Sequence, residues 1–491
     1  MRIRHNDYGV LSPPVIGAWT PELSVTVVIP AYDCQDELDR TLATLTAQTY
    51  PAHLLDVVVV DDGSDPPLRA RPTGALAVRV VRVEDGWGRG NARNTGARAA
   101  TGEVIHWLDA DMILAPDHIE AHMRWHHLID HAVVIGDIVF GTGFADGAAQ
   151  PYTAKMLAET RRLKDAGASA YLLHTGATTS VPARLLADAG GVDPRLNMAE
   201  DTELGYRLAQ AGAVFIPDGE ARSLHVGEST VMRRQQEVHR HNWSFLGDHI
   251  PDLRWLRGHP RRQWLVPYVR VVVEAGGYEE SRATVDSALA GSVPDVAVTL
   301  VGPWPLLTGG RRSSLDDPHL DLRLLRNLYE HEPRVDFAAA APVSVAPTPY
   351  LLTVPRGWVL GADTVARLVA REEGLVSVAL AEAAEGVVAA RLERTAAFAR
   401  ARRIGGDLDA LVDEMFGSLW VGAAEYGVTT AEEAEPLAGD PAKWRALAAR
   451  RKDEIKALQA EVSRLKRQLD TPATVARPRR GGLSTFLRRV I

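Results

Sequence analysis

Two aspartates one residue apart, Asp109 and Asp111, follow a short apolar run at residues 104–108. The run is typical of a buried β-strand, and alternate side chains of a strand share one face, so we expect both carboxylates to point the same way. Ligands of open α/β sheets bind at the carboxyl ends of the strands. Two oxygen ligands in that place predict a divalent cation that also holds a diphosphate.

The same Asp-x-Asp pattern recurs at Asp407 and Asp409, but in a different context. This copy follows Gly405 and Gly406 and precedes apolar residues at helical spacing. Such a context is typical of a helix start, where acidic residues are favoured by the helix dipole. We therefore assign the predicted cation site to the first copy.

The segments before Asp109 alternate between strand and helix patterns. Residues 36–46 carry leucines at helical spacing, and residues 91–100 predict a second helix. Apolar, β-branched runs predict buried strands at residues 24–30, 57–60, 78–83 and 104–108. Strands and helices that alternate in this way predict an α/β fold with a parallel sheet and right-handed crossovers.

Arg93 lies near the start of the second predicted helix, after a glycine-rich loop at residues 86–90. A guanidinium group donates paired hydrogen bonds to planar oxygen pairs, so Arg93 is suited to a phosphate or a carboxylate. The alternative is an ordinary arginine on the surface.

Length and composition indicate a globular chain of several domains. The 491 residues predict two to four domains, and 46% hydrophobic with 24% charged residues is typical of a soluble protein. A net charge of -8 argues against a general nucleic-acid binder, and the single Cys34 excludes an intrachain disulfide and a thiolate zinc site. The sequence has no apolar run of about 18 residues that would cross a membrane, and residues 1–23 lack the apolar core of a secretory signal. We therefore expect a cytoplasmic enzyme.

The first half of the chain resembles the glycosyltransferases of family 2, which use nucleotide-sugars and have the GT-A (Rossmann-like) fold. The resemblance covers roughly residues 22–250 and follows the order and spacing of the family. It is nearest to the bacterial chondroitin-polymerase type around residues 109–112. The matching segments are residues 27–32, 59–64, 92–96, 108–111, 190–193 and 199–204, followed by His225.

The resemblance implies a nucleotide pocket. Pro30, Ala31 and Tyr32 would line the pocket for the base. Asp62 would accept a hydrogen bond from the uracil imide, and Arg93 would lie near the nucleotide.

The resemblance also implies the residues of catalysis. Asp109 would hold the ribose or the metal, and Asp111 and His225 would ligate Mn²⁺ or Mg²⁺. Asp201 would be the general base that accepts the proton of the acceptor hydroxyl. The alternatives from the residues alone are an acidic helix start for Asp201 and a structural role for His225.

These implications predict an inverting transfer from a UDP-sugar to an acceptor hydroxyl that the sequence does not identify. The product would serve glycan, cell-envelope or secondary-product glycosylation. One alternative is a non-catalytic scaffold that binds a nucleotide-sugar, and another is one component of a polysaccharide polymerase. Residues 176–180 lack the asparagine of the Gly-Asn pair common in the family, which leaves acceptor recognition open.

Three histidines, His118, His122 and His126, occur four residues apart in a predicted helix. This spacing is able to bind metal, but the order differs from that of zinc proteases, in which Glu directly follows the first His. We interpret the three residues as one face of a helix.

After a catalytic domain at residues 1–255, residues 265–400 repeat its pattern in a degenerate form. In this repeat, Val301 is taken as the equivalent of Asp62. Thr353 and Pro355 are taken as the equivalents of Asp109 and Asp111. We therefore expect a GT-A-like accessory domain without a cation site, which binds acceptor or organises a dimer. An unrelated accessory domain is the alternative.

The C-terminal region is predicted to be helical. Residues 401–440 form a helical segment, and heptads at residues 443–470 predict a coiled coil that makes a homodimer. The basic tail at residues 471–491 is consistent with peripheral contact to anionic lipid on the inner membrane face, or with a disordered tail.

Overall fold

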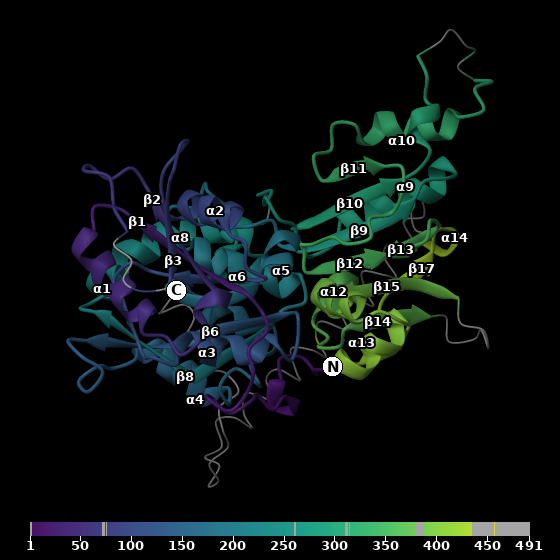
Figure 1. Ribbon diagram of the computed structural model, residues 1–491. Coiled ribbons are helices and arrows are strands. Elements are labelled where there is room, and N and C mark those ends of the chain that lie inside the picture. The colour runs from purple at the N-terminus through teal and green to yellow at the C-terminus, as the bar shows by residue number, and fades with distance from the viewer. Residues whose placement is uncertain are drawn as a thin grey trace.

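The chain folds into two α/β units that lie side by side in a computed structural model (Figure 1). The structure describes residues 2–434, apart from residues 71–73, 75, 260–261, 310–312, 314 and 380–386, together with Lys456. The predicted coiled coil at residues 443–470 and the basic tail at residues 471–491 lie outside the described residues, with the exception of Lys456. Among the described residues, no helix has both the length and the apolar composition needed to cross a membrane.

The first unit is built on an eight-stranded mixed sheet. β3, β2, β1 and β4 are parallel, β7 is antiparallel to both of its neighbours, and β6 is parallel to β8. The order is β3 (Ala77–Arg82), β2 (Leu55–Asp61), β1 (Val25–Ala31), β4 (Val104–Leu108), β7 (Thr178–Pro182), β6 (Ala132–Gly141), β8 (Val214–Val226) and β5 (Met112–Leu114).

Helices cover both faces of this sheet. One core joins the sheet to α1 and α3 through residues such as Leu42 and Met123, and the other joins it to α2 and α6 through Ala92 and Leu204. The helices are α1 (Gln35–Thr46), α2 (Arg89–Ala99), α3 (His118–His126), α4 (Pro151–Glu159), α5 (Ala183–Asp188), α6 (Glu200–Gln210), α7 (Thr230–Arg233) and α8 (Gln235–His249).

The sequence-based strands and helices of this unit are confirmed. The four predicted strands are β1 to β4, and the two predicted helices are α1 and α2, with bounds that differ by a few residues at most. Because β1 and β4 are hydrogen-bonded neighbours whose chains continue in opposite directions across the sheet, their carboxyl ends form the switch point where ligands bind in such folds.

The second unit repeats the strand order and directions of the first. β11, β10, β9 and β12 are parallel, β15 is antiparallel to both neighbours, and β14 is parallel to β16. A separate pair, β13 and β17, is antiparallel, as β5 and the end of β8 are. The strands are β9 (Val269–Glu274), β10 (Val296–Val301), β11 (Val335–Ala338), β12 (Tyr350–Thr353), β13 (Trp358–Leu360), β14 (Leu375–Ala379), β15 (Val388–Arg394), β16 (Ser418–Gly422) and β17 (Val428–Thr430).

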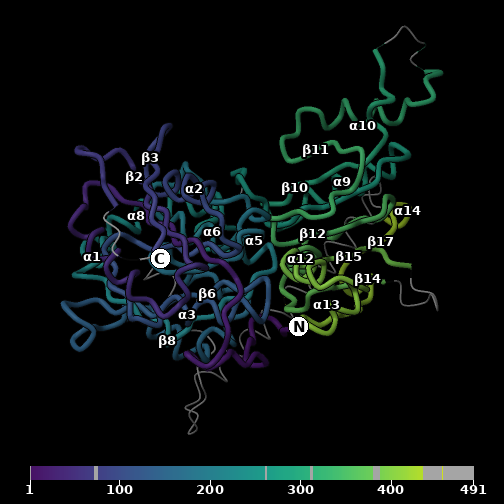
Figure 2. Tube along the Cα trace, in the orientation of Figure 1, coloured from purple at the N-terminus to yellow at the C-terminus, as the bar shows by residue number. Residues whose placement is uncertain are grey.

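Helices also alternate with the strands of the second unit, and Figure 2 shows the path of the chain. They are α9 (Tyr278–Leu289), α10 (Leu320–Tyr329), α11 (Thr364–Val369), α12 (Thr395–Ile404), α13 (Leu408–Phe416) and α14 (Ala431–Ala434). Asp407 caps α13 by accepting hydrogen bonds from the Asp409 and Ala410 N–H groups, so the second Asp-x-Asp copy is a helix start.

The strand register corrects the positions assigned to the second unit. Val25 pairs with Val104 in the first sheet and Val269 with Tyr350 in the second, so Asp109 and Asp111 correspond to Pro355 and Gly357. The sequence-based choice of Thr353 and Pro355 was therefore two residues too early. The corresponding pairing of β9 with β10 places Pro303, and not Val301, at the position of Asp62.

The domain boundary at residue 400 is also too early. Residues 401–440 were predicted to be helical, but they contain β16 and β17, and β16 pairs with β14 in the second sheet. The alanine- and glutamate-rich composition misled the prediction, because the short strand at 418–422 gains its stability from pairing with β14 and not from local propensity.

The two units share a polar interface at Arg400 of α12. Its buried guanidinium donates to the carbonyl oxygens of Gly212 at 3.0 Å and Ala213 at 2.7 Å in the first unit. It also donates to the Ile3 carbonyl oxygen in the N-terminal arm at 3.3 Å. One side chain of the second unit therefore fixes both the body and the N-terminal arm of the first.

Candidate active site

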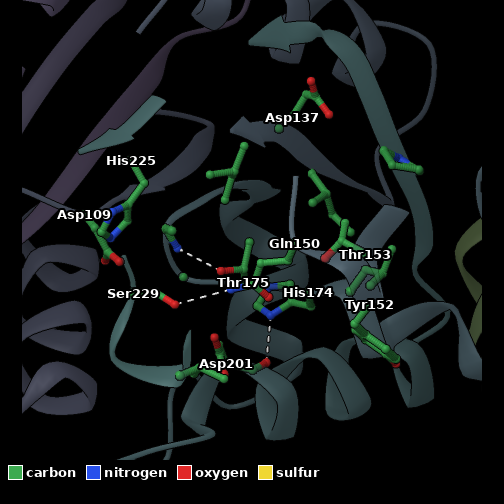
Figure 3. Close-up of a pocket in the computed structure, with 18 of the residues that line it drawn as sticks. Asp109, Asp137, Gln150, Tyr152, Thr153, His174, Thr175, Asp201, His225 and Ser229 are labelled. Atoms are coloured by element: carbon green, nitrogen blue, oxygen red, sulfur yellow. Dashed lines mark hydrogen bonds between the residues drawn. The ribbon is translucent and has the colours of Figure 1, made fainter. Parts of the chain in front are cut away.

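A cavity of about 360 Å³ opens at the carboxyl ends of β4 and β6 and the amino end of β7 in the first unit (Figure 3). Asp109, Asp111, Asp201 and His225 all line it, although they come from three separate places in the sequence. The loop after β4, the loop before β7 and the start of α6 converge there. The predicted metal ligands and the predicted base therefore open onto one shared space.

Asp111 and His225 face one another at the rim of this cavity. Strands β5 and β8 pair Met112 with His225, and this register brings His225 Nε2 to 3.3 Å from Asp111 Oδ2. Burial raises the pKa of Asp111, with His225 opposing the shift. Within the described part of the chain, His225 Nδ1 is buried without a hydrogen-bond partner. A carboxylate oxygen and an imidazole nitrogen at this distance fit a divalent cation of the Mn²⁺ type.

Arg93 joins two carboxylates on the wall of the cavity. Its Nη1 donates to Glu200 Oε1 at 2.7 Å and its Nη2 donates to Asp109 Oδ1 at 3.0 Å. The side chain is 3% exposed. Burial lowers the pKa of Arg93, but the carboxylates of Asp109, Glu200 and Asp201 outweigh this effect and raise it.

The residue pattern suited Arg93 to a phosphate or a carboxylate, and its paired donors contact carboxylates on the cavity wall. Its predicted place near the nucleotide stays a prediction. A Cβ atom at Gly176 would lie 2.2 Å from Arg93 Nη2, so Gly176 leaves the room that the guanidinium occupies. Arg93 therefore acts as a positioning residue that orients Asp109.

Asp201 lies in the first turn of α6 and is held through its backbone by His174. His174 Nδ1 donates to the Asp201 carbonyl oxygen at 2.7 Å, and both residues line the cavity. Burial lowers the pKa of His174 to about 4. His174 is therefore neutral near pH 7 and supports Asp201 without adding a positive charge beside it.

The candidate base pocket follows β1 and β2. Pro30 and Ala31 end β1, and Tyr32 stands 60% exposed after it. Asp62 Oδ2 accepts a hydrogen bond from the Gly88 N–H at 2.8 Å. Among the described residues its other oxygen, Oδ1, is buried and has no partner. An unpaired buried acceptor at this place fits the imide N–H of a uracil.

Sequence reasoning missed Glu200 and His174. Glu200 lies at an acidic helix start, and His174 lies ahead of β7 in a stretch without a recognisable motif. The same region supplies Gln150, Tyr152 and Thr153 to the cavity wall (Figure 3). Only the pairing of β7 with β4 brings this region to Asp109, whose N–H donates to the Ala177 carbonyl oxygen at 3.2 Å.

The family model described as "Glycosyl transferase family 2" matches residues 26–180, the segment that carries Asp62, Arg93, Asp109 and Asp111. This segment of the chain is therefore similar to glycosyl transferase family 2. The family 2 segment holds the candidate base pocket and the aspartate pair, whereas Asp201 and His225 lie beyond the matched residues.

Curated relatives match about a fifth to a quarter of this chain. A validoxylamine A glucosyltransferase from Streptomyces hygroscopicus subsp. limoneus is 35% identical over 117 residues, which are 23% of this chain and 26% of the relative. Glycosyltransferase AglE from Haloferax volcanii is 32% identical over 105 residues, or 21% of this chain and 32% of AglE. The chain thus spans about a quarter to a third of the length of these relatives.

Among solved structures, the mannosyltransferase PcManGT from Pyrobaculum calidifontis in complex with GDP-Man and Mn²⁺ is similar to this chain. The sequence identity is 22% and the TM-score is 0.37, over 49% of this chain and 66% of PcManGT.

Proposed function

We propose that this chain is a glycosyltransferase that moves a sugar from a nucleotide-sugar, a UDP-sugar, to an acceptor hydroxyl with inversion at the anomeric carbon. The observation that carries the proposal is the shared cavity of Asp109, Asp111, Asp201 and His225. A carboxylate–imidazole pair and a separate carboxylate at one cavity are the groups that such a displacement requires.

The donor binds across the carboxyl ends of β1, β2 and β4. Asp62 Oδ1 accepts the hydrogen bond of the uracil imide, and Tyr32 covers the base from the solvent side. Asp109, held by Arg93, accepts from the ribose hydroxyls or joins the cation ligands. Asp111 and His225 would hold Mn²⁺ or Mg²⁺, and the cation would supply positive charge to stabilise the leaving diphosphate.

Asp201 is the general base. It accepts the proton of the acceptor hydroxyl while the hydroxyl oxygen attacks the anomeric carbon from the face opposite the diphosphate. One displacement inverts the anomeric centre, so an α-linked donor gives a β-linked product. Gln150, Tyr152 and Thr153 line the cavity and offer polar contacts to the acceptor.

A donor screen tests the proposal without knowledge of the acceptor. UDP-sugars and, for comparison, GDP-sugars are incubated with the full chain and Mn²⁺ or Mg²⁺, and slow release of free nucleoside diphosphate is measured. We expect release from a UDP-sugar that stops when the metal is chelated. Asp111→Asn should reduce it at least tenfold, whereas Asp409→Asn, in the other Asp-x-Asp sequence, is the matched control and should retain it.

The Asp201→Asn variant distinguishes a catalytic glycosyltransferase from a scaffold that only binds nucleotide. With Asp201→Asn we expect nucleotide binding to persist and turnover to fall by about 10²–10⁴-fold, the usual contribution of a general base. A scaffold would bind nucleotide but release no product in either form. Equal turnover by wild type and Asp201→Asn would refute the assigned base, and an α-linked product from an α-linked donor would refute inversion.

A further inference from the structure

Three buried histidines meet behind the floor of the candidate active site. His118 and His122 lie one turn apart on α3, as the sequence predicted, but the face that they form is buried against the sheet. His106, in the middle of β4, points to the same place, with ring centroids 5.3 Å from His118 and 4.5 Å from His122. One ring nitrogen of each residue lies within 4.8 Å of the others.

The hydrogen bonds around this cluster leave His106 unsatisfied. His118 Nδ1 donates to the Arg222 carbonyl oxygen at 3.0 Å, so its Nε2 carries a lone pair. That Nε2 lies 3.0 Å from Thr178 Oγ1, and His122 Nε2 lies 3.4 Å from the same hydroxyl. Among the residues that the structure describes, neither ring nitrogen of His106 has a hydrogen-bond partner. A buried polar group without a partner costs about 1–3 kcal/mol, so the bare cluster is unfavourable.

The environment keeps these imidazoles in the form that binds metal. Burial lowers the pKa of His118 to about 4, and it lowers the pKa of His106 and His122 well below their usual range. All three rings are therefore neutral near pH 7 and have lone pairs to donate. His118 Nδ1 donates to a backbone carbonyl oxygen. Metal-bound histidines usually make a hydrogen bond of this kind through the nitrogen that does not bind the metal, and it fixes their tautomer.

We propose that His106, His118 and His122 bind one Zn²⁺ ion at a site separate from that of the catalytic cation. Three imidazole nitrogens are typical ligands of zinc, and the Thr178 hydroxyl or a water molecule completes the four ligands that zinc prefers. Mg²⁺ and Ca²⁺ prefer oxygen ligands and are not expected here.

The geometry needs only a small contraction to reach a zinc site. Zinc–nitrogen bonds of about 2.0–2.1 Å place tetrahedral ligand nitrogens about 3.3 Å apart. The observed separations, at most 4.8 Å, close by rotation of the imidazole rings.

The proposed ion would support the floor of the cavity. Gly136 lines the cavity, and a Cβ atom there would lie 3.0 Å from His122 Nε2. A zinc ion would join α3 to β4 directly beneath this floor. The expected role is structural, because the ligands lie in the core and the cluster is absent from the residues that line the cavity.

The test uses the full chain with the catalytic cation site disabled by Asp111→Asn. Zinc is measured by elemental analysis after dialysis, and Co²⁺ is added to chelator-treated protein to follow the visible spectrum. We expect about one zinc per chain and the strong absorption of four-coordinate Co²⁺. His122→Gln should weaken binding at least as much as the 10–100-fold loss typical of an altered outer contact. His131→Gln, a buried histidine bonded to Asp130, is the matched control and should retain the metal.

His106→Leu keeps the test decisive if His122→Gln does not fold. Leucine fills the place of the unsatisfied ring and leaves the hydrogen bonds of α3 intact, so the variant should fold. We expect it to lose zinc and to lose the increase in Tm that zinc gives the parent protein. Folded parent protein that binds neither Zn²⁺ nor Co²⁺ would overturn the proposal, as would unchanged zinc binding in folded His106→Leu.

Discussion

Arg93 shows how one cation organises the acidic wall of the cavity. It lies between Asp109 and Glu200, and Asp201 adds to the field that raises its pKa. Carboxylates this close would repel one another without a cation between them. The guanidinium therefore permits the carboxylates predicted to bind metal and to act as the base to share one small cavity.

Replacing Arg93 should destabilise the whole first unit. Arg93→Met removes the buried partner of Glu200 and leaves only the half-exposed Arg89 beside it, and breaking a buried ion pair costs about 3–5 kcal/mol. Arg89→Met is the matched control, because Arg89 contacts the same Glu200 at 3.5 Å but is 50% exposed. Arg89→Met should lower the free energy of unfolding by less than about 1 kcal/mol. Urea unfolding measures both, and equal effects of the two variants would contradict the central position of Arg93.

His174 predicts a pH dependence of stability. Its pKa is about 4 in the folded chain and 6.5 when unperturbed. Below pH 6.5 His174 binds a proton in the unfolded chain but stays neutral in the folded chain. The free energy of unfolding therefore decreases as the pH falls from about 6.5 to about 4 and is constant below that. His174→Gln should reduce the loss between pH 7 and pH 5 by about 2 kcal/mol. Unfolding curves of equal pH dependence for wild type and His174→Gln would rule out this assignment.

At the scale of elements, α2 is the helix that delivers Arg93, and Gly96 sets its distance from the sheet. A Cβ atom at Gly96 would lie 2.2 Å from Val28 Cγ1 and 3.0 Å from Val60 Cγ2. Both valines are fully buried strand residues and have little freedom to move. The close packing of α2 on β1 and β2 therefore depends on this glycine.

Gly96→Ala has two opposing effects on the free energy of unfolding. Alanine favours the helix by about 1 kcal/mol, whereas overpacking in a dense core costs about 1–3 kcal/mol. At 2.2 Å the overlap is severe, so overpacking should win with a net loss of about 1–2 kcal/mol and a drop in activity as Arg93 shifts. Arg98→Ala, on the exposed side of α2, is the control and should change neither. A stabilised Gly96→Ala would show that α2 moves freely.

At the scale of the whole molecule, the chain repeats one topology but not its chemistry. Pro303, Pro355 and Gly357 occupy the places of Asp62, Asp109 and Asp111. Thr430 occupies the place of His225, because β13 pairs it with Trp358 as β5 pairs His225 with Met112. We infer that the described part of the second unit provides support and not a second reaction.

Nucleotide binding should therefore be limited to one site per chain. Calorimetric titration with UDP and Mn²⁺ is expected to give a stoichiometry of about one, set by the single aspartate pair of the first unit. Asp111→Asn should remove the metal-dependent part of this binding. A second equivalent of UDP, retained in Asp111→Asn, would show that the second unit binds nucleotide through other groups.

Much of the first unit was predictable because its signals are local. Strand and helix patterns from Val25 to Leu108 follow the side-chain periods of buried strands and amphipathic helices, and Asp109 and Asp111 directly follow a strand. The second unit was harder to align. Its strands were recognised, but the register of Pro355 and Gly357 is set by pairing between strands, which a single sequence does not reveal.

The sequence by itself determined which residue types were available for catalysis, because the acids and histidines stand beside recognisable strands and helices. Only the tertiary structure decided their partners. Arg93 donates to Glu200 and Asp109, and His174 donates to the backbone of Asp201. His106 lies beside His118 and His122. The reason is physical. Secondary structure follows from neighbours along the chain, whereas these contacts join β4, α3 and α6 through the packing of the sheet and its helices.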